Sequence, residues 1–175
     1  MDEKTHPFVE YLETLRDDRA ALAALRRGLG LPPGTVADMY RYVVPWLPGD
    51  APPWREAAYY LIAALFAYHP DAGGAGNIGA HFARARARDP QGDDTAIERR
   101  FTALLAAHPD DLDSYLRQAV SFLKSKEVPV NWHRLLSDVL GWGSPSRYVQ
   151  RQWASAFWGR PAREAQAENQ ITEEE

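Results

Sequence analysis

The sequence predicts an all-α protein. Apolar residues recur every three or four positions along most of the 175 residues, as one buried face of an α-helix requires. No segment alternates apolar and polar residues in the way that is typical of a half-buried strand. Glycine and proline fall between the periodic segments, where helices end. We therefore expect two packed helical subdomains that form a compact helical bundle with no sheet.

Five helices are expected in the N-terminal half, at residues 8–15, 19–27, 36–44, 54–68 and 81–88. Asp18 is a candidate N-cap for the second of them. Residues 54–68 are apolar on nearly every side, so we expect this helix to run through the middle of the N-terminal half.

Four further helices are expected at residues 95–105, 111–126, 132–140 and 149–157, with Asn131 as a candidate N-cap. The polar segment 89–94 is the best candidate for a boundary between subdomains. The expected organisation is an N-terminal helical subdomain over residues 1–90, a C-terminal one with a basic face over 91–162, and a disordered acidic tail over 163–175.

The composition excludes several kinds of chemistry. The chain has no cysteine, which excludes disulfides, thiolate metal sites and a cysteine nucleophile, and is compatible with a reducing cytoplasm. Its longest apolar run, residues 57–68, is too short to span a bilayer. The acidic, amphipathic start of the chain is unlike a signal peptide. We expect a cytoplasmic protein that has no membrane partner.

Charge is unevenly distributed. Residues 114–163 carry eight basic and two acidic side chains, a net charge of +6, although the whole chain has a net charge of −4. Residues 164–175 carry −5. A local basic excess on an acidic protein suggests a polyanionic partner.

The basic residues also share helix faces. Arg117, Ser121 and Lys124 lie at i, i+4 and i+7, and Arg147 and Arg151 lie one turn apart. Solvated arginines on ordinary amphipathic helices are the alternative interpretation, and the residues alone leave it open.

No motif indicates catalysis. Residues 74–79, GAGNIG, match G-x-G-x-x-G, but no strand precedes them, so a loop is expected there instead of a dinucleotide site. The five histidines are scattered without metal-ligand spacing, and Asp110, Asp111 and Asp113 fit the first turn of a helix. We expect no enzyme activity, no metal and no cofactor.

Tryptophan is a second candidate means of contacting nucleic acid, because its ring can stack on bases. Trp132 and Trp153 lie on apolar stripes and should be buried. The positions of Trp142 and Trp158 are left open.

Several segments of the C-terminal half resemble the CasB-type small subunit of the type I-E CRISPR Cascade complex. They are RRF (99–101), LRQAVSFLKS (116–125), VPVNW (128–132), LLSDVLGW (135–142) and VQRQWASAFW (149–158). The N-terminal segments 18–30 and 59–70 are similar to the same family, so the resemblance runs from residue 8 to about residue 160.

This resemblance implies an all-helical, non-catalytic subunit that is present in two copies beside the backbone and large subunits of a guide-RNA complex. A basic surface would hold the target heteroduplex and the displaced non-target strand and so stabilise the R-loop. No small-molecule substrate is implied. The residues expected at nucleic acid are Arg117, Lys124, Lys126, Arg99, Arg100, Arg134, Arg147, Arg151, Arg26 and Arg27.

Two other functions compete with this interpretation. A helical scaffold could dock an acidic protein on the same basic face. A helix-turn-helix regulator would need an exposed recognition helix, and the helix expected at 132–140 is a poor candidate because most of it should be buried.

Overall fold

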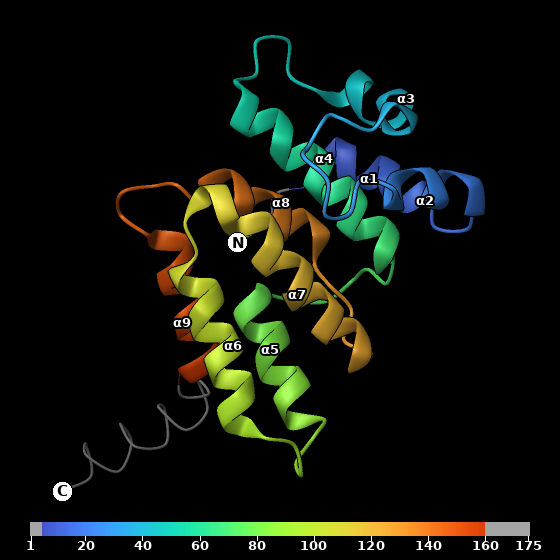
Figure 1. Cartoon of the computed structure of the whole chain (residues 1–175). Helices are drawn as coiled ribbons and strands as arrows, with labels where there is room; N and C mark the ends of the chain where they lie inside the picture. Colours follow the sequence, from blue (N-terminus) through green and yellow to red (C-terminus); the bar gives the residue numbers. More distant parts are fainter. Residues whose placement is uncertain (1–4, 160–175) are drawn as a thin grey trace, which may run out of the picture.

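The computed structural model describes residues 5–159, which form nine α-helices and three short 3₁₀ helices (Figure 1). The predicted tail at 163–175 lies outside the described residues. No strand occurs between residues 5 and 159, and only an isolated parallel bridge joins Ala72 to Val130, so the all-α prediction is confirmed. The elements are α1 Pro7–Thr14, α2 Arg19–Arg26, η1 Ala37–Met39, α3 Tyr40–Val43, η2 Val44–Trp46, α4 Pro53–Tyr68, α5 Ile78–Ala87, α6 Asp94–Ala106, η3 Pro109–Asp111, α7 Leu112–Ser125, α8 Trp132–Gly141 and α9 Tyr148–Trp158.

Side-chain caps begin several of these helices. Asp18 accepts hydrogen bonds from the backbone N–H groups of Ala20 and Ala21, both at 3.0 Å. Asn131 accepts one from Arg134 N at 2.9 Å. Each cap satisfies backbone donors that have no partner within the helix, so both predicted N-caps are confirmed.

Two predicted helices differ from the structure. The helix expected at 81–88 begins earlier, at Ile78, because Asn77 caps it by accepting a hydrogen bond from Ala80 N at 3.1 Å. The loop predicted over 74–79 is therefore wrong for its last two residues. The helix expected at 36–44 is one α-helical turn between two 3₁₀ segments. Pro45 contributes to the early end of the α-helix, because a proline has no N–H group to donate to a carbonyl of the preceding turn.

Helix α4 is the centre of the fold. Most of its residues from Ala58 to Ala67 are buried, on several faces of the helix. It packs against α2 and α3 of the N-terminal half and against α7 and α8 of the C-terminal half. The rings of Phe66 and Trp132 meet edge to face at 5.8 Å, which links α4 to α8. The predicted central helix therefore joins the two halves.

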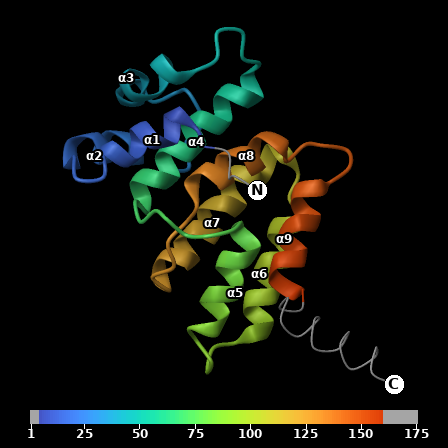
Figure 2. The ribbon, with the colours of Figure 1, turned by 180° about the vertical axis from the view of Figure 1, so that it is seen from behind.

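The remaining helices gather on either side of this junction. In Figure 1, α1–α3 lie above with α4, and α5, α6, α7 and α9 lie below; Figure 2 shows the same division from behind. Helix α5 packs closely on α9. The approach is so close that a Cβ at Gly79 would lie 2.0 Å from the carbonyl oxygen of Trp153. The subdomain boundary at 89–94 stays a prediction. No helix of residues 5–159 is long and apolar enough to cross a membrane.

The histidines have structural roles. His69 hydrogen-bonds the Val128 carbonyl at 2.8 Å, and His6 Nε2 lies 2.6 Å from Ser137 Oγ. His81, on α5, is completely buried, and neither ring nitrogen has a hydrogen-bond partner. Burial, helped by the charge of Arg84 and by His69, lowers the pKa of His81 from 6.5 to about 3. His81 is therefore neutral in the folded protein at neutral pH.

We expect this histidine to make the fold acid-sensitive. The unfolded chain binds a proton at His81 near pH 6.5, whereas the folded chain does so only near pH 3, so stability falls as the pH drops between these values. The loss approaches about 1.4 kcal/mol per pH unit. Urea unfolding at pH 7 and pH 4.5 should show a smaller loss for His81→Leu than for the wild type. His108→Leu, at an exposed histidine beside Asp110, is the control, and an equal effect of both variants would contradict this assignment.

Candidate nucleic-acid interface

The outer face of α7 carries the basic residues that the helical spacing predicts. Leu112, Leu116, Ala119, Val120 and Leu123 form the buried stripe. Arg117, Ser121 and Lys124 are exposed on another face of the same helix. This face of α7 is therefore available to a ligand.

Lys124 also links α7 to the C-terminal end of α4. Its Nζ donates a hydrogen bond to the Tyr68 carbonyl at 2.7 Å and lies 4.2 Å from the centre of the Tyr68 ring. The Tyr68 hydroxyl lies 3.2 Å from Ser121 Oγ. The ammonium is a cation near the C-terminal end of α4, where helix carbonyls lack partners. Lys124 remains exposed to solvent.

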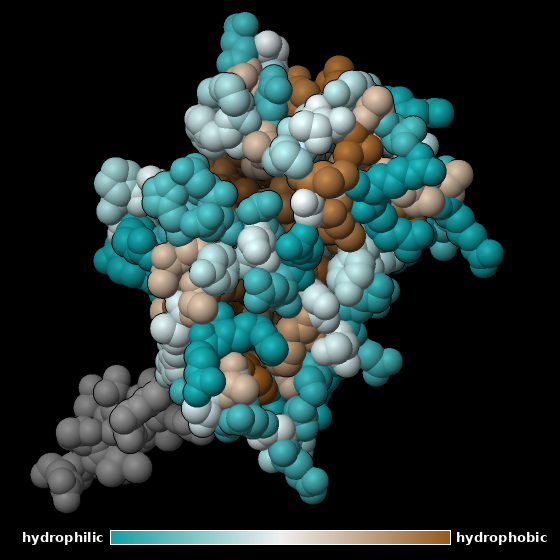
Figure 3. Space-filling model, viewed as in Figure 1, coloured by the Kyte–Doolittle hydropathy of each residue, from teal (hydrophilic) through white to brown (hydrophobic). Residues whose placement is uncertain are grey.

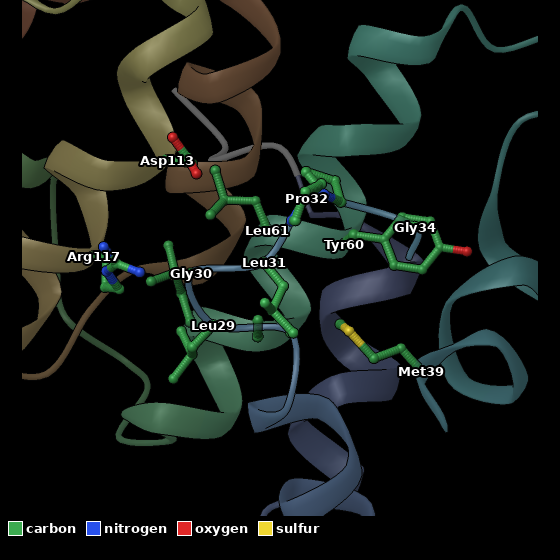
Figure 4. A pocket seen from close by; sticks show the side chains of 14 residues that line it. Leu29, Gly30, Leu31, Pro32, Gly34, Met39, Tyr60, Leu61, Asp113 and Arg117 are labelled. Atoms are coloured by element: carbon green, nitrogen blue, oxygen red, sulfur yellow. The ribbon is translucent and has the colours of Figure 1, made fainter. Parts of the chain in front are cut away.

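Arg117 lies against the loop that follows α2. Figure 4 shows its guanidinium beside Gly30, on one wall of a small hollow that Asp113 also lines. Gly30 has φ +73°, and a Cβ there would lie 2.0 Å from Arg117 Nη1. The left-handed backbone and the close approach both favour glycine at this position. The loop therefore helps to set the position of Arg117.

A groove between α6 and α7 adds two more predicted residues. Arg99 and Arg100 line it from α6, and Tyr115 and Gln118 line it from α7, around a volume of about 360 Å³. The Arg100 guanidinium lies 4.8 Å from the centre of the Phe122 ring. No carboxylate lines this groove. We call the groove and the outer face of α7 together the basic surface; its residues are Arg99, Arg100, Tyr115, Arg117, Gln118, Ser121 and Lys124.

Tyr115 and Gln118 were not predicted as site residues, because the prediction rested on positive charge and neither side chain is cationic. Their spacing of three residues places them on one side of α7, and that is the only sequence signal that could have found them. A phenol and an amide beside two guanidinium groups can contact both bases and phosphates.

Two other predicted residues are engaged in ion pairs. Lys126 Nζ lies 2.5 Å from Asp89. Arg134 donates from Nε to the Asp138 carboxylate and from Nη2 to Gln152, both at 2.8 Å. Asp138 is buried and also accepts a hydrogen bond from Trp153 Nε1 at 2.6 Å. Both cations are engaged by partners within the protein. Their predicted contact with nucleic acid stays a prediction and has less support than that of the exposed cations.

The remaining predicted residues lie apart from the basic surface. Arg147 precedes α9, where it donates from Nη2 to the Leu105 carbonyl at 2.6 Å, and Arg151 is exposed on α9. Arg26 and Arg27 are exposed at the end of α2, where Arg27 pairs with Asp38. These residues also stay untested predictions.

The four tryptophans of the C-terminal half differ in exposure. Trp132 and Trp153 are buried, as predicted. Trp142 is also buried, and its Nε1 donates to the Ala107 carbonyl at 3.1 Å, which excludes it from stacking on bases. Trp158 is 45% exposed and its ring lies 5.3 Å from that of Phe101. Of these four, Trp158 alone presents substantial surface to solvent.

Three arginines in or next to α5, none of them predicted as a site residue, make contacts within the protein. Arg88 donates to the carbonyls of Lys126 and Glu127 at 3.1 and 2.5 Å. Arg86 lies 3.6 Å from Glu98 and over the Phe157 ring. Burial lowers the pKa of Arg84, with a smaller contribution from the charge of Arg88. Helix α5 thus uses its arginines to contact neighbouring segments.

We expect Gly30→Ala to destabilise the protein. The substitution introduces an unfavourable left-handed alanine, so the free energy of unfolding should fall by about 1 kcal/mol, whereas the exposed end of Arg117 can move away from the new methyl group. Gly49→Ala is the matched control, because a Cβ at Gly49 meets nothing within 4 Å. Urea unfolding measures the stability of both variants, and equal stability would show that the left-handed backbone at Gly30 does not disfavour alanine.

Arg134→Ala should also destabilise the fold, by about 2 kcal/mol, because it removes the guanidinium that pairs with the buried Asp138 carboxylate, which keeps its hydrogen bond from Trp153. Arg151→Ala, an exposed arginine on the neighbouring helix, should change the free energy of unfolding by less than about 0.5 kcal/mol. Thermal and urea unfolding would detect the difference, and a neutral Arg134→Ala would return this residue to the candidates for phosphate binding.

Known proteins are similar to this chain in sequence and in fold. Residues 21–158 match the family model described as CRISPR-associated protein Cse2. A Cse2 protein from Thermus thermophilus is 38% identical over an alignment of 171 residues that covers 94% of this chain and 95% of that protein. The crystal structure of CasB from Thermus thermophilus superposes with a TM-score of 0.76 and 34% identity, covering 89% of this chain and 99% of that chain.

A chain in a structure of a CRISPR RNA-guided surveillance complex superposes with a TM-score of 0.73 and 28% identity, covering 86% of this chain and 88% of that one. These matches agree with the resemblance to CasB-type subunits, which is confirmed. The chain belongs to the Cse2 family of CRISPR-associated proteins.

Proposed function

We propose that this Cse2 protein is the non-catalytic small subunit of a type I-E CRISPR RNA-guided surveillance complex. Its basic surface binds the backbone of the displaced non-target strand and of the target heteroduplex, and so stabilises the R-loop. Its neighbours in the complex are the backbone and large subunits, the guide RNA and a second copy of the chain. The similarity to a chain of such a complex supports the assembly, and the basic surface supports the contact with nucleic acid.

The observation that carries the proposal is the absence of carboxylates from the α6–α7 groove, where Arg99 and Arg100 lie beside Gln118 and Tyr115. A polyanion is attracted to such a groove and repelled from acidic surface. Lys124 and Arg117 continue the cationic surface along α7. Phosphate contacts of this kind hold a strand without reading its sequence.

This mode of binding suits a guided complex. Pairing between guide and target selects the sequence, and exchanging DNA pairs for RNA–DNA pairs is nearly balanced in free energy. Protein contacts to the backbone can tip that balance. A small number of cations that act on any sequence is therefore sufficient for the proposed role.

The test reverses charge at both ends of the basic surface. In the assembled complex, Arg99→Glu with Arg117→Glu should lower R-loop formation on a matching supercoiled plasmid by about tenfold or more at physiological salt. The slope of log affinity for single-stranded DNA against log salt should become shallower by about 1.4, because two phosphate contacts are lost. Permanganate reactivity of the displaced strand measures the R-loop.

The matched control is Arg19→Glu with Arg55→Glu, which changes the net charge equally at exposed first-turn positions of α2 and α4. Melting temperatures establish that both double variants fold. Equal R-loop formation by the two would refute the basic surface. If instead the Arg99/Arg117 variant failed to join the complex before DNA was added, the surface would be a docking face for an acidic protein.

A further inference from the structure

A second and larger groove lies between the two halves of the molecule. It has a volume of about 690 Å³ and lies between the first turns of α4, the start of α7 and the end of α8. Its lining is mainly apolar, and Figure 3 shows it as the brown hollow in the upper part of that face. The apolar lining residues include Trp54, Ala58, Leu61, Leu112, Val139 and Leu140.

One side chain of this groove is unusually exposed for its type. Trp54, in the first turn of α4, is 60% exposed, the highest value among the large exposed hydrophobic residues of the described chain. A large apolar side chain beside an apolar hollow is typical of a surface that another protein covers. The groove therefore has the shape and the polarity of a docking site.

Charge excludes nucleic acid from this groove. Asp110 and Asp113 line it, both near the start of α7, and neither lysine nor arginine is among its lining residues. Carboxylates repel phosphate, in contrast to the guanidinium groups of the α6–α7 groove. Charge complementarity instead favours an occupant with a cationic side chain next to an apolar one.

We propose that this groove binds a segment of a different protein subunit, which inserts an apolar side chain beside Trp54 and places lysine or arginine near Asp110 and Asp113. This inference takes from the proposed function only that the chain works within a protein assembly. It does not depend on the basic surface. The two grooves would then bind different partners. The α6–α7 groove would bind a polyanion, and the apolar groove would bind a protein segment with apolar and cationic side chains.

Photo-crosslinking tests the identity of the occupant. The full-length chain with p-benzoylphenylalanine in place of Trp54 is assembled into the complex in its host, purified and irradiated, and the adducts are sequenced by mass spectrometry. We expect one main adduct, to another protein subunit, at a segment that contains apolar residues and lysine or arginine. The same substitution at Trp158, exposed on α9, is the control and should not give that adduct.

Adducts to nucleic acid or to a second copy of the chain, or no adduct above the Trp158 control, would overturn the proposal. A failure of the nucleic-acid proposal is distinguishable, because charge reversal at Arg99 and Arg117 would then leave R-loop formation unchanged while the Trp54 adduct still formed.

A second measurement does not depend on Trp54. Asp110→Asn with Asp113→Asn should reduce co-purification of the chain with the complex about fivefold, because two ion pairs at the rim are lost. Asp17→Asn with Asp94→Asn is the matched control, since both residues are exposed and lie outside the groove. Equal recovery of the two folded variants would overturn the assigned role of the carboxylates.

Discussion

The structure depends on the need to cover helix α4. Its residues from Ala58 to Ala67 are apolar on most sides, so packing against one neighbour would leave hydrophobic surface in water. Helices α2 and α3 cover part of it and α7 and α8 cover the rest, which binds the two halves into one core. Other links across this junction follow, such as the hydrogen bonds of Lys124 with Tyr68 and of His69 with Val128. The α6–α7 groove and the apolar groove beside Trp54 both lie where this packing leaves open surface.

The protein uses its cations in two ways. Arg134 and Arg88 are held by partners from their surroundings, and removing such a cation takes a charged hydrogen-bond donor away from a buried carboxylate or from backbone carbonyls. Arg99 and Arg117 lie on exposed surface and can exchange water for phosphate at lower cost. This distinction is physical, since a paired and partly buried cation has already lost its hydration. A net charge of +6 over residues 114–163 therefore overstates the charge that a ligand can reach.

The two grooves have opposite chemistry although both adjoin α7. Asp113, at its start, lines the apolar groove, whereas Gln118, further along the helix, faces the guanidinium groups of α6. Asp113 also lines the same hollow as Arg117, one turn further along α7, so the acidic and the cationic surfaces of this helix adjoin each other. The proposed protein neighbour and the proposed nucleic-acid strand would therefore bind at separate grooves.

The sequence by itself determined the helices, most of the core and several caps, because those features depend on neighbours within a turn or two. The spacing of Leu116, Val120 and Leu123 predicts the buried side of α7, and Asp18 and Asn131 cap helices through groups two or three residues away. The family resemblance could also be recognised from the sequence. Only the tertiary structure decided which cations are free. Lys126 meets Asp89 and Arg147 meets Leu105 across 37 and 42 residues, and helical periodicity contains no information about such pairs. The grooves have the same origin, since their walls come from helices that only the packing around α4 brings together.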